Sequence, residues 1–398
     1  MSERLQCERC QALFAVNEVR YECECGGLLT VERDSIAAGP AEFDARRRDR
    51  TGIDASGVWR FREGVLAVEP DEIIAHPEGD TRLYERFGVF FKHEGENPTG
   101  SFKDRGMTVA VTQAVRLGAR AIACASTGNT SASLAAYAAQ AGLRAVVFVP
   151  AGRISAGKLG QTLAYGATCL QVRGDFDAAM RLVREASARL GIYLVNSINP
   201  FRIEGQKTIV WELLQDLGWK APHWIVAPAG NLGNTGAFGK ALREARDAGW
   251  IDTMPRLAAI QAAGANPFYR SFRESFSRRH RVTAETIATA IRIGDPVSHE
   301  RAISAIRSTN GVVEEVTDEE IVQAKREIDA AGIGCEPASA ATWAGVKKLR
   351  NAGVMRDGET IACILTGHVL KDAESMMQSA AGKVVEVDAT VEAVERVL

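Results

Sequence analysis

From residue 121 onward, short apolar runs alternate along the chain with longer segments of helical spacing. An apolar run bounded by glycine or polar residues predicts a buried strand, and apolar positions that recur every three or four residues predict an amphipathic helix. The predicted strands are 121–125, 145–149, 168–172, 193–196, 225–227, 257–261 and 361–365. The predicted helices include 132–141, 176–190, 203–217 and 235–248.

This alternation predicts an α/β fold of parallel sheets covered by helices, with ligands bound beyond the carboxyl ends of the strands. Thr317-Asp318-Glu319-Glu320 has the form of a capping box and predicts a further helix toward Ala331. Residues 36–80 carry no motif that we can interpret.

Composition limits the classes of function. The chain has 398 residues, 46% of them hydrophobic, which is enough for about two to three domains with buried cores. A formal net charge of −2 gives no basis for a nucleic-acid partner. The chain has no uninterrupted apolar stretch of about twenty residues and no apolar signal region near Met1, so we expect a cytoplasmic protein without a membrane partner.

The segment from Asn97 to Met107 places Lys103 between small turn-forming residues and a charged pair. A free lysine has a pKa of about 10.4 and must be desolvated or lie beside other cations before its amine can attack an aldehyde. Taken alone, Ser-Phe-Lys-Asp favours a surface turn with one solvated lysine. Two motifs downstream favour an aldehyde cofactor.

The first of these motifs, Ser126-Thr127-Gly128-Asn129-Thr130-Ser131, lies between a predicted strand and a predicted helix. Its hydroxyl and amide side chains exceed what one helix cap requires, and a helix N-terminus attracts anions. The second, Pro228 to Gly236, again joins strand to helix and contains three glycines, whose backbone N–H groups can converge on a phosphate. It matches neither the dinucleotide fingerprint nor the nucleoside-triphosphate loop.

Together these motifs resemble the pyridoxal-phosphate enzymes of the tryptophan synthase β family, or fold type II, and within it the threonine synthases. The similarity covers roughly everything after residue 80. It implies two parallel-sheet domains with pyridoxal 5'-phosphate between them. The large domain would comprise 36–104 and 206–398, and a small mobile domain 105–205.

The resemblance also implies roles for particular residues. Lys103 would form the Schiff base with the cofactor and act as catalytic base and acid, and Asn129 would bond the ring hydroxyl. Thr366 would face the pyridine nitrogen, because a hydroxyl there adds no negative charge that would keep the nitrogen protonated. The segment Glu336 to Ala340 would form a wall of the active site and start a helix. The cofactor phosphate would be held by Gly230, Asn231, Leu232, Gly233 and Asn234.

A fourth segment, Leu194 to Arg202, narrows the substrate. Arg202 offers a fork of donors suited to phosphate, and a surface salt bridge is its alternative role. By resemblance, the phosphate of O-phospho-L-homoserine would be bound by Lys158, Asn196, Ser197 and Arg202, and the substrate carboxylate by Ser126, Thr127 and Thr130. The implied reaction yields L-threonine and phosphate by γ-elimination and β-addition of water, in a homodimer.

Three alternatives remain open at this point. A threonine or serine dehydratase would leave the Arg202 cluster without a phosphate to bind. A cysteate synthase-like enzyme acting on phosphoserine has a substrate shorter by one methylene, which is worth only about 1 to 3 kcal/mol of discrimination. A non-catalytic, cofactor-binding regulatory protein is the third.

Four cysteines near the N-terminus form a separate motif in residues 1–35. Cys7 and Cys10 have Cys-x-x-Cys spacing, and Cys23 and Cys25 are followed by two glycines, which resembles a zinc ribbon of four thiolates. The second pair has one intervening residue instead of the usual two or more. Despite this departure, the four cysteines predict a structural zinc ion. A redox-sensitive pair and a ribbon that has lost its metal are the alternatives.

Overall fold

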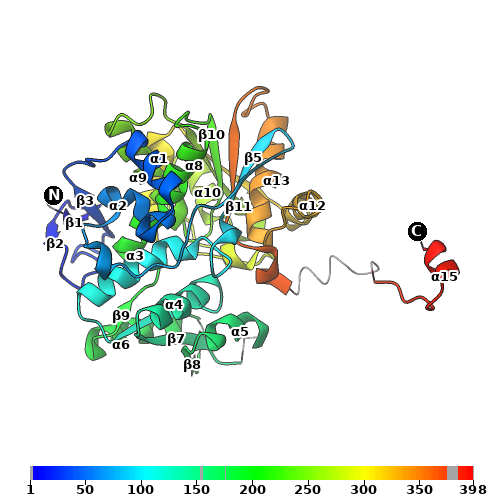
Figure 1. Ribbon diagram of the computed structural model, residues 1–398. Helices are drawn as coiled ribbons and strands as arrows, with labels where there is room; N and C mark the ends of the chain where they lie inside the picture. Colours follow the sequence, from blue (N-terminus) through cyan, green and yellow to red (C-terminus); the bar gives the residue numbers. More distant parts are fainter. Residues whose placement is uncertain (1–2, 153–155, 175, 374–383, 398) are drawn as a thin grey trace.

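The computed structural model describes residues 3–152, 156–174, 176–373 and 384–397. Its strands are β1 (Glu3–Cys7), β2 (Leu13–Ala15), β3 (Leu29–Arg33), β4 (Leu83–Arg86), β5 (Val89–His93), β6 (Ala121–Ala125), β7 (Arg144–Pro150), β8 (Thr168–Val172), β9 (Tyr193–Leu194), β10 (Trp224–Pro228), β11 (Arg256–Ala262), β12 (Val312–Val316) and β13 (Ile361–Leu365). They form three sheets with the orders β2-β1-β3, β12-β11-β10-β13-β5-β4 and β8-β7-β6-β9 (Figure 1).

Helices cover the sheets and fill the connections between strands. They are α1 (Pro40–Asp49), α2 (Arg62–Val65), α3 (Lys103–Arg116), α4 (Asn129–Gln140), α5 (Ala156–Ala164), α6 (Phe176–Leu190), α7 (Pro200–Gln206), α8 (Thr208–Asp216), α9 (Gly233–Asp247), α10 (Pro267–Arg273), α11 (His299–Ser308), α12 (Asp318–Ala330), α13 (Pro337–Asn351) and α15 (Val391–Glu395). Within the described ranges, no helix combines the length and the hydropathy that a membrane crossing requires.

The six-stranded sheet is buried on both faces. Along β10, Ile225 and Ala227 belong to a core shared with α8 and α9, whereas Trp224 and Val226 belong to a core shared with α12 and α13. Successive side chains of a strand point to opposite faces, so a strand covered on both sides is apolar throughout. Only the β4–β5 pair of this sheet is antiparallel.

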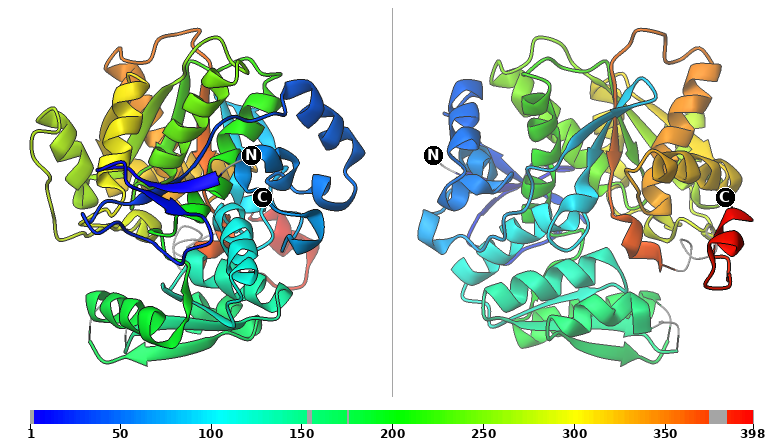
Figure 2. Two further views of the ribbon diagram at one scale, coloured as in Figure 1. Left: turned by 90° about the vertical axis from the view of Figure 1, so that its left-hand side faces the viewer. Right: turned by 45° about the vertical axis from the view of Figure 1, so that its right-hand side comes forward.

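The four-stranded sheet is entirely parallel and forms a second layered unit. Ile122 and Cys124 of β6 pack in a core with α3 and α4, and Ala123 packs with Val183 of α6 on the other face. Figures 1 and 2 show this unit beneath the six-stranded sheet, with the antiparallel sheet of β1–β3 beside both. The loops after β6 and β10 are therefore brought to the junction of the two parallel sheets.

Most elements predicted from periodicity are confirmed, including all seven strands and the capping box at Thr317. The predicted helix 203–217 is instead two helices, α7 and α8. The Thr208 hydroxyl donates to the Gly205 carbonyl at 2.6 Å, a side-chain bond that competes with the helical ladder at this break. Strand β9 ends at Leu194, because the Asn196 side chain, and not its backbone, pairs with Ala125 of β6.

Candidate active site

Lys103 is the first residue of α3 and lies against the end of β13. The backbone N–H of Phe102 donates to the Thr366 carbonyl at 3.0 Å, and Ser101 forms an isolated bridge with Gly367. The Lys103 amine lies over the Phe102 ring, 3.8 Å from its centroid. The lysine segment and the segment around Thr366, both selected in the sequence analysis, are thus hydrogen-bonded to each other.

The Lys103 amine is desolvated and has a positively charged neighbour. Burial, with Arg202 as the second cause, lowers the pKa of Lys103 to about 7, although the carboxylate of Glu336 acts in the opposite direction. A lysine with this pKa is about half neutral at pH 7 and can act as nucleophile and base. The electrostatics suit the role that the sequence suggested.

Asp104 and Arg105 hold the lysine segment in place through neighbours and not through each other. Asp104 accepts bonds from the backbone N–H of Thr99 at 2.7 Å, the Thr99 hydroxyl at 2.6 Å and the Ser133 hydroxyl at 2.6 Å. Arg105 is fully buried and pairs with Glu94 and Glu212. The first turn of α3 is therefore fixed on both sides of Lys103.

The glycine-rich loop between β10 and α9 is built to approach a ligand closely. Leu232 has a φ of 64°, and α9 begins without a side-chain cap. A Cβ atom on Gly230 would lie 2.8 Å from the Ile291 backbone, so glycine is required there. Among the described residues, the buried Asn234 Oδ1 and Thr235 Oγ1 find no hydrogen-bond partner. Uncapped N–H groups and unpaired polar atoms at one helix start are what a bound phosphate would satisfy.

These residues fit pyridoxal phosphate. Lys103, with its lowered pKa, could form a Schiff base with the cofactor aldehyde. The start of α9 offers hydrogen-bond donors for the cofactor phosphate. Asn129 at the start of α4 and Thr366 after β13 offer an amide and a hydroxyl for the ring substituents. Glu336 joins the two, accepting from Asn129 Nδ2 at 3.0 Å and from Thr366 Oγ1 at 3.2 Å.

Ser197, one of the residues proposed for the substrate phosphate, lies against the glycine-rich loop between β10 and α9. Asn231 Nδ2 donates to Ser197 Oγ at 2.6 Å, which joins the loop after β10 to the segment after β9. The Asn196 amide exchanges two bonds with the Ala125 backbone, at 3.0 and 3.1 Å, so only one of its hydrogens is free for a ligand. Asn196 thus holds the segment after β9 against β6, whereas Ser197 and Arg202 have more hydrogen-bonding capacity left for a ligand.

Arg202 is a buried cation without an anion. Its exposed fraction is 2%, Nη1 donates to the Val195 carbonyl at 3.2 Å, and Nε has no partner. No carboxylate of the described residues forms an ion pair with it, and burial lowers its pKa to about 10. The surface salt bridge considered from sequence is therefore excluded for the described part of the chain. An uncompensated buried charge is costly, and a bound anion would offset that cost.

The remaining predicted substrate contacts lie at the start of α4 and in α5. Ser126, Thr127 and Thr130 are partly exposed around the start of α4, whose N-cap, Gly128, makes no side-chain cap bond. Lys158 belongs to α5, but its side chain lies outside the described residues.

Sequence reasoning missed three polar contributors. Thr235 lies inside the glycine-rich motif but was not selected from sequence. Only the folded structure shows that its hydroxyl is buried and unpaired, and therefore available to a ligand. Glu336 and Ser339 were assigned to a wall, whereas both bond the Thr366 hydroxyl. A charged residue followed by Pro at a predicted helix start was the available sign.

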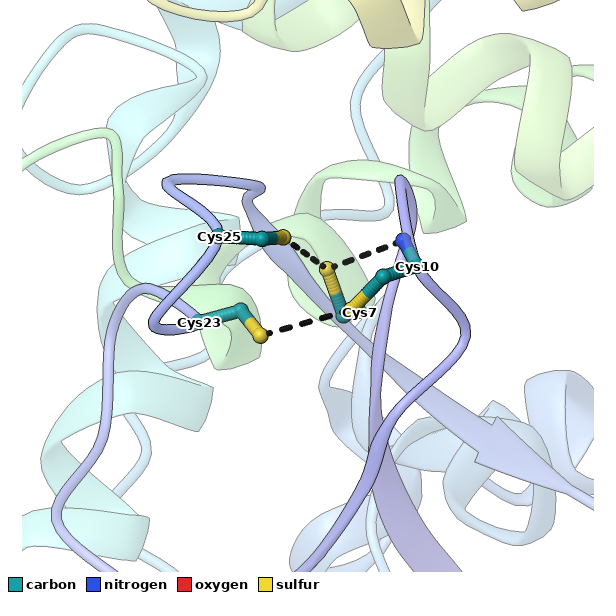
Figure 3. Close-up of side chains that lie close together, drawn as sticks. All are labelled: Cys7, Cys10, Cys23 and Cys25. Atoms are coloured by element: carbon teal, nitrogen blue, oxygen red, sulfur yellow. Dashed lines mark hydrogen bonds between the residues drawn. The ribbon is translucent and has the colours of Figure 1, made fainter.

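The four N-terminal cysteines converge (Figure 3). Their sulfur atoms all lie within 4.8 Å of one another, with Cys7–Cys25 and Cys10–Cys23 separations of 3.5 Å. Four sulfurs at Zn–S distances of about 2.3 Å in a tetrahedron would be about 3.8 Å apart. A Cβ atom on Gly27 would lie 2.6 Å from the Cys7 sulfur, so the second glycine after Cys25 makes room for the four sulfur atoms.

Comparison with known proteins agrees with this geometry. The model of the family "Pyridoxal-phosphate dependent enzyme" matches residues 73–367. Threonine synthase from Methanocaldococcus jannaschii is 43% identical, with 99% of this chain and 98% of the relative covered. Threonine synthase from Methanosarcina acetivorans is 44% identical, with the same coverage. The crystal structure of Escherichia coli threonine synthase shares the fold with a TM-score of 0.76 at 20% identity, covering 99% of this chain and 94% of that one.

The α/β fold, the family match and the full-length relatives define a pyridoxal-phosphate-dependent enzyme of the lyase class. The chain belongs to the threonine synthase branch of the pyridoxal-phosphate-dependent enzyme family.

Proposed function

We propose that this protein converts O-phospho-L-homoserine and water into L-threonine and phosphate. The observation that carries the substrate assignment is Arg202, a buried cation with no carboxylate partner in the described residues. It donates to the Val195 carbonyl and is close enough to Lys103 to lower the pKa of that lysine. A dehydratase substrate carries no phosphate to pair with this charge. The full-length similarity to threonine synthases supports the same assignment.

Arg202, Ser197 and Lys158 would hold the substrate phosphate, and Asn196 would keep that segment in register with β6. The partly exposed hydroxyls of Ser126, Thr127 and Thr130, with the uncapped N–H groups at the start of α4, would hold the carboxylate. Two anions fixed at opposite ends orient the carbon chain between them.

Lys103, Asn129 and Thr366 would contact the cofactor, with the phosphate held by residues 230–235. Bound pyridoxal phosphate supplies an electron sink for the carbanion formed at Cα. The neutral Lys103 amine would take the Cα proton and then the Cβ proton as the phosphate leaves Cγ, and it would return one proton to Cγ, which becomes the methyl group of threonine. Water then adds at Cβ, and the two remaining protons go to Cα and to the departing phosphate. A pKa of about 7 lets Lys103 both accept and return these protons near neutral pH.

The test is steady-state release of phosphate and threonine from O-phospho-L-homoserine by the cofactor-loaded protein. O-phosphoserine, threonine and serine are assayed in parallel. Equimolar phosphate and threonine support the proposal. Turnover of a parallel substrate alone would move the assignment to a phosphoserine enzyme or a dehydratase.

Arg202→Met should lower kcat/KM for O-phosphohomoserine by roughly a hundredfold or more, because truncating one partner of a buried, hydrogen-bonded charge pair costs about 2 to 5 kcal/mol. The loss should appear mainly in KM. The ligand-free protein should melt no lower than wild type, because the substitution removes an uncompensated buried charge. Steady-state kinetics measures kcat/KM and KM, and thermal unfolding measures the melting temperature.

The matched control is Arg189→Met, since Arg189 is 75% exposed in a surface pair with Glu185. It should change neither quantity. If Arg202→Met kept full kcat/KM, the anion would have to bind elsewhere.

A zinc ion held by Cys7, Cys10, Cys23 and Cys25 is the second part of the proposal. Thiolates in a near-tetrahedral group are typical ligands of structural zinc. The cysteine loops are anchored to α11, where Arg9 pairs with Glu300 at 2.6 Å. They also reach the four-stranded sheet, where the Leu194 N–H donates to the Tyr21 hydroxyl at 2.7 Å. The metal would therefore fix a segment that touches both parallel-sheet units.

Removing the metal should destabilise the protein. After chelation, or in Cys10→Ser, we expect the melting temperature to fall by about 5 °C, which corresponds to roughly 2 kcal/mol for a large domain. Elemental analysis should give one zinc per chain in the wild type. Cys169→Ser, a cysteine outside the ribbon, is the control. Protein prepared anaerobically with zinc supplied, yet containing none, would refute the site.

A homodimer in the cytoplasm completes the proposal, on the strength of the family resemblance. Light scattering coupled to size exclusion measures the mass directly. A monomer that turns over would reject the dimer.

A further inference from the structure

Glu336 occupies a central place between the two residues proposed for the cofactor ring. It is 5% exposed and precedes α13. One carboxyl oxygen accepts from Asn129 Nδ2 at 3.0 Å and the other from Thr366 Oγ1 at 3.2 Å. A Cβ atom on Gly367 would lie 2.4 Å from the carboxyl carbon, so glycine there lets the carboxyl group pack against the backbone.

Ser339 fixes the direction of a further bond to Thr366. The Ser339 hydroxyl oxygen accepts from the N–H groups of Thr366 at 2.8 Å and Gly367 at 3.1 Å. A hydroxyl oxygen has two lone pairs and one hydrogen. Both lone pairs are therefore occupied, and the Ser339 hydrogen points to Thr366 Oγ1 at 3.0 Å. Thr366 is left with its own hydrogen and one lone pair.

The protonation state of Glu336 decides which partners the Thr366 hydrogen and its remaining lone pair can bond. If Glu336 is ionised, it takes the Thr366 hydrogen, and only a protonated ring nitrogen could bond the remaining lone pair. If Glu336 is neutral, its own hydrogen fills that lone pair while its other oxygen still accepts from Asn129. The Thr366 hydrogen then points to an unprotonated ring nitrogen.

The surroundings shift Glu336 toward its neutral form, relative to an exposed carboxyl group. Burial raises the pKa of Glu336 above its ordinary value, although the bonds from Asn129 and Thr366 and the charges of Lys103 and Lys371 act in the opposite direction. Those four groups face Glu336 from α4, the end of β13, α3 and the turn at Val369–Asp372. Lys103 opposes the neutral form less as it loses its own charge near pH 7.

We propose that Glu336 is a positioning residue that, in its neutral form, turns the Thr366 hydroxyl toward the cofactor ring and keeps the ring nitrogen unprotonated. This inference rests on the proposed function, because it assumes pyridoxal phosphate between Asn129 and Thr366. It goes further by assigning to the Glu336 carboxyl group, which acts through Thr366, control over the ring's charge.

The experiment loads the full-length protein with pyridoxal phosphate carrying nitrogen-15 in the ring and follows the nitrogen chemical shift from about pH 6 to pH 8. Wild type should show the unprotonated shift throughout. Glu336→Gln should show the same shift, because the amide nitrogen donates to Thr366 and the amide oxygen accepts from Asn129. In Glu336→Ala the Thr366 lone pair is free, and the shift should move toward the protonated value as the pH falls.

A protonated nitrogen in wild type would overturn the inference, as would a Glu336→Gln shift unlike that of wild type. A Glu336→Ala nitrogen that stays unprotonated over the whole range would do the same. If Glu336→Ala fails to fold, wild type and Glu336→Gln still decide. No substrate is present, so the result is independent of whether O-phosphohomoserine is turned over, whereas a protein that binds no labelled cofactor would sink both proposals.

Discussion

Lys103→Ala is expected to lose turnover by a factor on the order of 10⁴, the upper range for a positioned acid and base. The variant also loses the amine that holds the cofactor covalently. Phosphate release from O-phosphohomoserine, measured with excess pyridoxal phosphate, gives the first readout. Borohydride reduction followed by mass spectrometry gives the second, since it fixes the cofactor to wild type only.

Lys220→Ala, which alters an exposed lysine in the loop between α8 and β10, should retain both turnover and covalent attachment of the cofactor. The lowered pKa of Lys103 adds a pH dependence. Because the neutral amine is the reactive form and its pKa is about 7, attachment of the cofactor to the free protein should speed up as the pH rises to neutrality. It should level off above about pH 8, well below the value of about 10.4 for a free lysine. Multiple turnovers by Lys103→Ala would remove the residue from the mechanism.

Glu212→Gln is expected to cause the largest loss of stability, about 3 to 5 kcal/mol in the free energy of unfolding. Glu212 is fully buried in α8 and accepts from Arg105 at 2.8 Å, Lys92 at 2.7 Å and Arg60 at 2.8 Å. A neutral amide leaves three buried cations with one carboxylate fewer among them. Since Arg105 follows Lys103 and Asp104 on α3, the loss should also weaken cofactor binding.

Urea unfolding followed by circular dichroism measures the change. Glu185→Gln, in the exposed pair with Arg189, is the control and should cost less than about 1 kcal/mol. The pKa of Glu212 is lowered well below its ordinary value by Arg105, Lys92 and Arg60, against the effect of burial. The contribution of ionised Glu212 to stability is therefore complete above about pH 4.3. The difference in stability between wild type and Glu212→Gln should shrink as the pH falls further, toward the lowered pKa of Glu212. A Glu212→Gln variant as stable as Glu185→Gln would show that the network is dispensable.

Seven of the ten strands in the four-stranded and six-stranded sheets could be predicted from sequence, because each is a short local pattern, whereas β4, β5 and β12 were not predicted. Strands 121–125, 168–172 and 361–365 have the bounds that periodicity predicted. Strand β12 was missed, since Glu314 and Glu315 interrupt its apolar pattern. It lies at the edge of the six-stranded sheet, where charged side chains are tolerated and only pairing with β11 makes the segment a strand.

The sequence by itself determined most elements after residue 120, because periodicity depends on near neighbours along the chain, and its resemblance to a family supplied the candidate roles of Lys103, Asn129 and Thr366. Only the tertiary structure decided the environment of these groups. It placed Arg202 in the interior without a carboxylate, and it brought Glu336 from 207 residues away onto Asn129. Burial and hydrogen-bond direction depend on what packs around a side chain, and that is set when distant segments meet and exclude water.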